Sequence, residues 1–233
     1  MSKGGSFENE IAKKLSLWFT EGKREDIFGR SDGSGARFTK RSKKGKDTAN
    51  QGADITFTDI LGEQLIKFWS IEVKTGYSGK KKVKDADGDV VQIPIYAPAK
   101  KGEKKKDKHQ RKIIGWKDKK ELVPWDVLDF IDSKQKKPTL QSMWQQCVRD
   151  ALLTKRYPIL IFRRNGRKPC ICLTRSYFMS LLANFGKIRA TVLKIDLFGT
   201  DYPHFNRLTI IPLQDFFDWA QPVDRFLFED ILD

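Results

Sequence analysis

The apolar pattern that builds a hydrophobic core is interrupted in the middle of this chain. Apolar residues recur over about residues 3–76 and again over about 138–220, whereas residues 77–137 are rich in lysine and aspartate. A core needs apolar side chains that return at helical or strand spacing. We therefore expect a single domain over 1–233, with a basic insertion over about 77–137 and a C-terminal tail over about 221–233.

The two apolar segments predict an α/β fold. Helices that alternate with strands are typical of a central mixed β-sheet flanked by helices. Ser6 is the expected N-cap of the first helix, Asp59–Glu63 is an expected turn, and Val90–Ile95 is an expected short strand within the insertion. In chain order we expect a helix over about 7–21, strands over 53–58 and 65–74, a helix over 139–154, strands over 157–163 and 169–174, a helix over 175–185, strands over 192–197 and 208–211, and a helix over 213–220.

The charge of the chain is strongly positive and unevenly distributed. There are 45 Lys and Arg residues against 30 Asp and Glu residues, a net charge of +15 at pH 7. Six basic residues and no acidic residue lie between Arg37 and Lys46, and Tyr77–Lys120 holds 15 basic and six acidic residues. Such a charge makes a polyanion the expected partner, and nucleic acid is a better candidate than a membrane.

Membrane, secreted and zinc-stabilised proteins are not indicated. The sequence contains no apolar run of the roughly 18 residues that span a bilayer, and its first residues contain no apolar signal core. Its three cysteines and two histidines suit neither a dense disulfide framework nor a structural zinc site. We expect a cytoplasmic protein, nucleoid-associated in a cell or in the host cytoplasm if it is viral.

Two acidic residues and a lysine lie in the region of the first two predicted strands. Asp54 begins the first strand, and Glu72 and Lys74 lie two residues apart on the second, so they share a face. A turn centred on Glu63 would place Asp54 opposite Glu72. Two facing carboxylates favour a divalent cation with oxygen ligands, which indicates Mg²⁺. Lys74 would then orient a water molecule or stabilise charge on a phosphate.

Glu8 is a fourth candidate for the site. At helical spacing it shares a stripe with the apolar residues Ile11, Ala12 and Leu15. A carboxylate on a core-facing stripe is costly unless it is paired or bound to a metal. Two interpretations remain open: Glu8 completes the site, or it complements the positive end of the helix dipole.

These residues together resemble the PD-(D/E)xK nuclease superfamily, and within it the archaeal-type Holliday junction resolvases, with a phage source as one option. Lys3–Ile11 resembles the opening helix of that family, in which Lys-Gly precedes the catalytic glutamate. Arg30–Ser34 resembles its Arg-Ser-x-Gly-Ser loop. Asp54, Glu72 and Lys74 match the remaining catalytic positions.

The resemblance implies a restriction-endonuclease-like core and a role for each residue. Asp54 and Glu72 would hold Mg²⁺ together with the carbonyl oxygen of Val73, with Mn²⁺ as the alternative metal. Glu8 would complete the metal site directly or through water, and Lys74 would position the nucleophilic water. A homodimer is also implied, because a junction has two symmetric strands to cut.

Further residues are candidates for contact with DNA. Gln145, on the helix after the insertion, is a possible accessory residue beside the site, and a surface position is the alternative. Trp116 and Trp125 would either stack on bases between lysines or anchor a loop to the core. The residues expected to contact DNA are Arg30, Ser31, Ser34, Arg37, Lys40, Arg41, Lys43 and Lys44.

Three functions stay open on the sequence. The first is a Mg²⁺-dependent DNA endonuclease that resolves branched DNA. The second is a restriction-like or repair nuclease on duplex or flap DNA, because the insertion and the long 34–54 loop depart from a compact resolvase. The third is a basic DNA-binding protein without catalysis. The apolar and acidic tail, Phe226–Asp233, would pack on the domain or bind a partner.

Overall fold

The chain divides into two compact units. One comprises Met1–Gly76 with Asp126–Asp233, and the other comprises Tyr77–Trp125. The sequence placed the end of the insertion near residue 137, whereas the second unit ends at Trp125. The computed structural model describes residues 3–31, 53–76, 79–98, 112–123, 125–132, 138–199 and 201–222.

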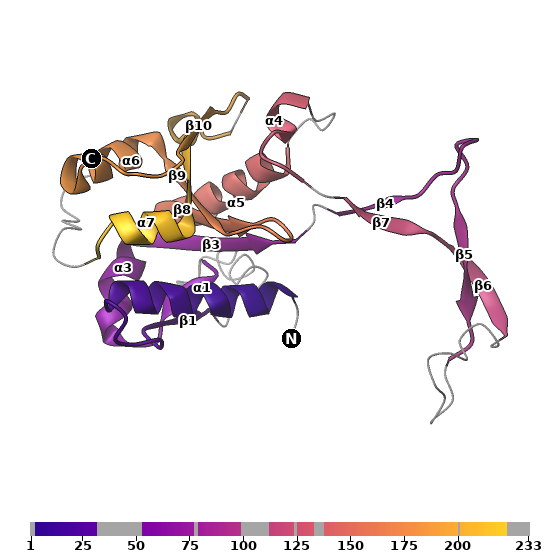
Figure 1. Ribbon diagram of the computed structural model, residues 1–233, viewed down its shortest axis with the longest axis horizontal. Coiled ribbons are helices and arrows are strands. Elements are labelled where there is room, and N and C mark those ends of the chain that lie inside the picture. Colours follow the sequence, from indigo (N-terminus) through magenta and orange to yellow (C-terminus); the bar gives the residue numbers. More distant parts are fainter. Residues whose placement is uncertain are drawn as a thin grey trace. The chain divides into compact units, whose positions relative to one another are not determined.

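The first unit contains helices and strands in alternation (Figure 1). None of its helices, within the described part of the chain, combines the length and the apolar character that crossing a bilayer requires. Its elements are α1 (Lys3–Phe19), β1 (Phe28–Arg30), β2 (Ile55–Phe57), η1 (Ile60–Gly62), α3 (Glu63–Phe68), β3 (Trp69–Thr75), α4 (Asp129–Asp132), α5 (Thr139–Leu153), β8 (Tyr157–Arg163), β9 (Cys170–Thr174), α6 (Arg175–Phe185), β10 (Leu193–Asp196), η3 (Pro203–Phe205), β11 (Arg207–Pro212) and α7 (Leu213–Trp219).

A five-stranded mixed sheet forms the centre of this unit. The strand order is β10-β11-β9-β8-β3. β3 runs parallel to β8, with Glu72 beside Leu160 and Lys74 beside Phe162, and the other neighbouring strands are antiparallel. The expected α/β class with a mixed central sheet is therefore confirmed.

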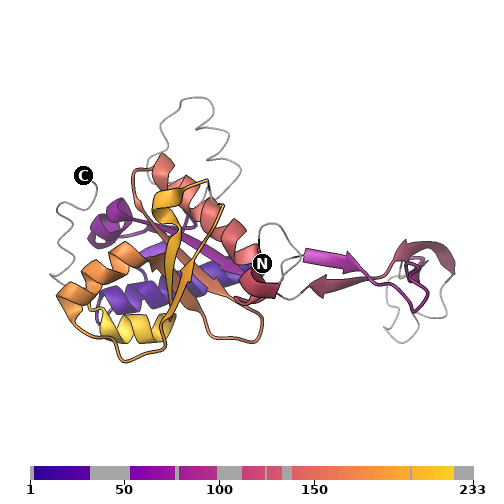
Figure 2. The same ribbon diagram turned by 90° about the horizontal axis from the view of Figure 1, so that it is seen from above.

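Helices cover both faces of the sheet (Figure 2). α1, α6 and α7 share a buried cluster with Trp69, Ile71 and Val73 of β3. α5 packs against β3 and β8 with its buried residue Trp144. Because side chains alternate along a strand, Glu72 points away from the α1 side and toward α5.

Ser16 connects α1 to the small β1–β2 ribbon. Its hydroxyl donates a hydrogen bond to the carbonyl oxygen of Ala12 (2.8 Å) and accepts one from the backbone N–H of Phe28 (2.9 Å). Ser16 is fully buried. In the antiparallel ribbon, Arg30 lies opposite Ile55, the first residue of β2. Asp54 directly precedes Ile55 in the chain, so the ribbon brings Arg30 near Asp54.

The expected hairpin centred on Glu63 is wrong. β2 pairs with β1, and the chain reaches β3 through η1 and α3 rather than through a tight turn. The carboxylate of Asp59 caps η1 by accepting from the N–H of Leu61 (3.0 Å), and Glu63 pairs with Lys67 at helical spacing (3.2 Å). A Cβ at Gly62 would lie 2.6 Å from a ring carbon of Phe28, so glycine permits the close approach of this connection to β1.

Ser6 is also not the N-cap of the first helix. α1 begins at Lys3, and Ser6 is an exposed residue within it. The apolar residues at helical spacing begin only at Phe7. They therefore do not predict the polar first turn of α1, which precedes Phe7. The helix still buries the predicted residues, since Phe7, Ile11 and Leu15 are at most 1% exposed.

The second unit consists of two antiparallel strand pairs. β4 (Gly79–Lys82) pairs with β7 (Lys120–Val123), and β5 (Gln92–Tyr96) pairs with β6 (Ile113–Asp118). The sequence predicted the strand at β5 but otherwise only partial order. The described part of each sheet has two strands, and most of its side chains are exposed or half-buried. A sheet without a buried face needs no apolar alternation, which explains why its pattern was weak.

Candidate active site

The carboxylates of Asp54 and Glu72 come together beside β3, with the ammonium of Lys74 between them. The Lys74 Nζ atom lies 3.4 Å from Asp54 Oδ2 and forms an ion pair with Glu72 Oε1. The side chains of Asp54 and Glu72 are 9% and 6% exposed, and that of Lys74 is 24% exposed. The charged cluster therefore remains open to solvent through its lysine.

Backbone hydrogen bonds position Asp54 without a hairpin. Its N–H donates to the carbonyl oxygen of Ile71 (3.1 Å), and its carbonyl oxygen accepts from the N–H of Ser31 (2.9 Å). Its carboxylate oxygen Oδ2 accepts from the N–H of Val73 (2.9 Å). Asp54 thus lies next to β3 as predicted, although the connection between them differs from the prediction.

Ser31 has a structural role instead of the expected contact with DNA. It is 4% exposed, and its hydroxyl donates to the carbonyl oxygen of Ala53 (2.5 Å). Together with the Ser31–Asp54 backbone hydrogen bond, this contact holds the start of β2 beside β1. A buried hydroxyl that is already hydrogen-bonded offers no surface to a phosphate.

Glu8 joins the same cluster from α1. Its side chain is 12% exposed and forms an ion pair with Arg30 of β1. Burial raises the pKa of Glu8, and the charge of Asp54 raises it further, while Arg30 and Lys74 act in the opposite direction. Arg30, expected to contact DNA, is half exposed and neutralises this carboxylate.

The glutamine that contacts the acidic cluster is Gln146 rather than Gln145. The Gln146 Nε2 atom donates to Glu72 Oε1 (2.8 Å). The Gln145 side-chain nitrogen is buried and has no hydrogen-bond partner among the described residues. Both glutamines flank the buried stripe of α5, so helical spacing alone does not choose between them. The choice depends on which face of β3 carries Glu72, and Gln146 is the glutamine that reaches it. We did not predict the role of Gln146 from the sequence.

The cluster has more negative than positive charge in its interior. Burial raises the pKa of Glu72 to about 7, and the neighbouring charge of Asp54 contributes to the rise. Burial lowers the pKa of Lys74, but the charges of Glu72 and Asp54 outweigh that effect and raise it. A second cation would therefore be stabilised at this place, because like carboxylates in a low-dielectric site repel each other.

The donor atoms present suit a hard cation. Among the described residues, the donors reach Asp54 Oδ2 and Glu72 Oε1, and none reaches Asp54 Oδ1 or Glu72 Oε2. Carboxylate oxygens are the ligands that Mg²⁺ prefers. However, the described residues contain no group of three or more His, Cys, Asp or Glu side chains arranged around a common metal position.

The other predicted site residues divide into two sets. Val73 is 4% exposed, and its N–H is bonded to Asp54, so its peptide group adjoins the carboxylates. The remaining residues expected to contact DNA lie outside the described part of the chain, and these are Ser34, Arg37, Lys40, Arg41, Lys43 and Lys44.

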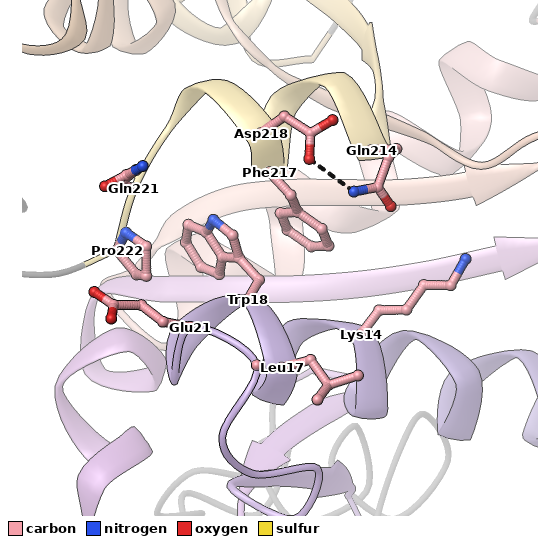
Figure 3. Close-up of a pocket in the computed structure, with 10 residues that line it drawn as sticks. Lys14, Leu17, Trp18, Glu21, Gln214, Phe217, Asp218, Gln221 and Pro222 are labelled. Atoms are coloured by element: carbon pink, nitrogen blue, oxygen red, sulfur yellow. Dashed lines mark hydrogen bonds between the residues drawn. The ribbon is translucent and has the colours of Figure 1, made fainter.

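A hollow of about 790 Å³ between α1 and α7 is separate from the acidic cluster. Figure 3 shows Trp18 of α1 and Phe217 of α7 on its walls, with Gln214 hydrogen-bonded to Asp218 (2.9 Å) at its rim. Its walls include none of the predicted catalytic residues. The hollow therefore does not mark the same site.

Comparisons of the chain with family models, with curated proteins and with solved structures found no match. The likeness to PD-(D/E)xK nucleases therefore rests on the motif residues.

Proposed function

We propose that this chain is a divalent-metal-dependent DNA endonuclease with a restriction-endonuclease-like core of the PD-(D/E)xK type. One observation carries the proposal: Asp54, Glu72 and Lys74 meet at β3, the last strand in the order of the five-stranded sheet, with both carboxylates nearly buried and the lysine partly exposed. Strongly perturbed charges in contact with solvent are typical of catalytic sites. The motif order along the chain agrees with the same chemistry.

Asp54 and Glu72, with the carbonyl oxygen of Val73, are the residues that would hold the metal. A divalent ion in such a site activates water and neutralises charge on the phosphate. Lys74 brings a donor and a positive charge to the same place, and we assign it the orientation of water and the stabilisation of the charge that develops on the phosphate oxygens. Water attacks phosphorus, the bond to the 3′ oxygen breaks, and the products carry 5′-phosphate and 3′-hydroxyl ends.

Three further residues would position these groups. Gln146 donates to one oxygen of Glu72, which fixes the orientation of that carboxylate. Glu8 adds a third carboxylate near Asp54, and Arg30 restrains Glu8. Partners that hold a metal-binding carboxylate in this way usually matter for activity nearly as much as the ligands themselves.

DNA is the substrate that best suits the charge of the chain. A net charge of +15 favours a polyanion, and basic residues that neutralise phosphates release counterions on binding. Branched DNA, cut by a homodimer, is the substrate that the motif resemblance favours. Duplex or flap DNA is the alternative substrate for the same site.

A DNA-binding protein without catalysis is the second candidate function. It is favoured by the net charge of +15, which attracts DNA whether or not the acidic cluster is catalytic. In that case Lys74 simply neutralises two buried acids. The two candidates differ in what substitution of the acids does to DNA cleavage.

The test compares DNA cleavage and DNA binding in the same variants. We expect Asp54→Asn, Glu72→Gln and Lys74→Ala each to abolish Mg²⁺-dependent cleavage while binding in EDTA survives. Glu63→Gln is the matched control, because Glu63 is paired with Lys67 on α3 and takes no part in the site. Cleavage that persists in the Glu72→Gln, Lys74→Ala double variant would refute the site assignment. A wild-type chain that binds DNA and never cuts it would favour the second candidate.

A further inference from the structure

The two tryptophans of the second unit have opposite environments. Trp125 is 5% exposed, which agrees with the interpretation that it anchors a loop. Trp116 is 61% exposed. Exposing so large an apolar ring to water is unfavourable, and Ile113 of the same strand is 44% exposed, so this strand indicates a contact surface.

The local geometry keeps the Trp116 ring accessible. Trp116 lies on β6 directly opposite Pro94 of β5, in a sheet whose described part has two strands. The pairing shifts register near Ile95, which leaves Ile114 as an extra residue in β6. Ile114 is also 59% exposed. Such a bulge increases the local twist of the strand and changes the direction of its side chains.

The unit that carries this exposed ring is strongly basic in composition. Residues 77–125 contain 15 basic and seven acidic residues. Lys117 follows Trp116 directly in the chain and Lys112 precedes it by four residues, and both side chains are exposed. The acid nearest in sequence, Asp118, is neutralised by Lys82 (2.7 Å) and accepts a hydrogen bond from Gln92 (2.9 Å). An exposed aromatic ring among lysines is the combination that binds single-stranded nucleic acid.

We propose that Trp116 stacks on an unpaired base of DNA while Lys112 and Lys117 contact the neighbouring phosphates. Every base has a flat face, so stacking of this kind tolerates any sequence. In a regular duplex those faces are covered by neighbouring base pairs, whereas single strands and open branch points expose them. The inference deepens the proposed function in that it names the DNA feature that the second unit recognises, but it does not depend on cleavage.

The test measures DNA affinity of the full chain in EDTA, so that no cleavage occurs. Trp116→Ala and Trp116→Phe are compared with the wild type on a labelled single strand and on a blunt duplex by fluorescence anisotropy. Loss of one stacked base costs about 1–3 kcal/mol, which at about 1.4 kcal/mol per factor of ten is a loss of about 5- to 140-fold in affinity. We expect that loss for Trp116→Ala on the single strand, a smaller loss for Trp116→Phe, and unchanged affinity for the duplex.

Lys117→Ala is the matched control for the charge contribution. It should reduce the slope of log affinity against log salt by about 0.7 on single strands, whereas Trp116→Ala should leave that slope unchanged. Wild-type affinity of Trp116→Ala for the single strand would overturn the inference, and so would an equal loss on both DNAs. Absence of nuclease activity would refute the proposed function alone, since the stacking measurement contains no catalytic step.

Discussion

The carboxylate of Asp54 accepts hydrogen bonds from two residues of β3, one from a backbone N–H and one from a side chain. The N–H of Val73 and the ammonium of Lys74 both reach its Oδ2 atom. Among the described residues, the donors to the Glu72 carboxylate are the side chains of Lys74 and Gln146. Burial and the neighbouring charge of Asp54 both raise the pKa of Glu72, so the charged form of Glu72 is poorly stabilised.

Glu72 should make the metal-free protein less stable as the pH rises. Its folded-state pKa is about 7, against 4.5 as the ordinary value, so the folded chain binds a proton that the unfolded chain has released. Stability then falls with rising pH across that interval, and the full cost is present above it. Thermal unfolding in EDTA should show that Glu72→Gln gains Tm relative to wild type between about pH 4.5 and 7. A difference that stays constant with pH would contradict this assignment, and Glu63→Gln should show none.

Gln146 should matter for activity and Gln145 should not. Removing a residue that orients a metal-binding carboxylate commonly costs about 10- to 100-fold in activity or metal affinity. We expect that loss of kcat or of Mg²⁺ affinity for Gln146→Ala, because the variant frees the Glu72 carboxylate. Gln145→Ala, one residue away on the same helix, is the control. Equal effects of the two variants would argue for a general disturbance of α5.

The residues of the site were more predictable than their connections. Strand alternation correctly grouped Glu72 with Lys74. The hairpin expected to bring Asp54 to them was wrong, although the structure places all three side chains together. Gln146 could not be found, since its role depends on which face of β3 meets α5. Six of the residues expected to contact DNA lie outside the described ranges, so their role stays a prediction.

At the scale of elements, α1 matters because it delivers Glu8 while packing against β1. The buried hydroxyl of Ser16 is the polar connection between the two elements. Substitution by alanine leaves the N–H of Phe28 without that acceptor, and an unsatisfied buried donor costs about 1–3 kcal/mol. We expect Ser16→Ala to lower the free energy of unfolding by that amount in urea titrations.

Ser6→Ala is the control for this prediction. Ser6 is an exposed residue of the same helix, and a surface substitution should change stability by less than about 0.5 kcal/mol. Equal stability of the Ser16→Ala variant and the wild type would show that the hydroxyl does not hold α1 to β1.

Element prediction worked where local and long-range signals agree. The helix over 175–185 and the strand over 157–163 have the predicted bounds. β8 is an apolar run buried on both faces, and Thr174 caps α6 by accepting from the N–H of Tyr177 (3.2 Å). The strand predicted over 65–74 was wrong for its first residues, which belong to α3. The apolar residues there fit a helical as well as a strand period. The expected hairpin between β2 and β3 does not form because β2 pairs with β1 instead. Local sequence signals do not indicate which strand β2 pairs with.

At the scale of the whole molecule, the chain combines an α/β unit with a strand-rich basic unit. The first unit carries the acidic cluster, and the second carries the exposed Trp116. Positive charge attracts any nucleic acid without regard to sequence or shape, so charge alone supplies no selectivity. In this account, cleavage belongs to the acidic cluster and recognition of unpaired bases to Trp116.

The most direct measurement is cleavage of a labelled four-way DNA junction beside its matched linear duplex, in Mg²⁺ and in EDTA. We expect symmetric nicks in the junction with Mg²⁺, none in EDTA, and none with the Asp54→Asn variant. Equal cutting of the linear duplex would contradict the preference for branched DNA. Binding of the junction without any cutting in Mg²⁺, or undiminished cutting by Asp54→Asn, would contradict the central claim that this acidic cluster hydrolyses DNA.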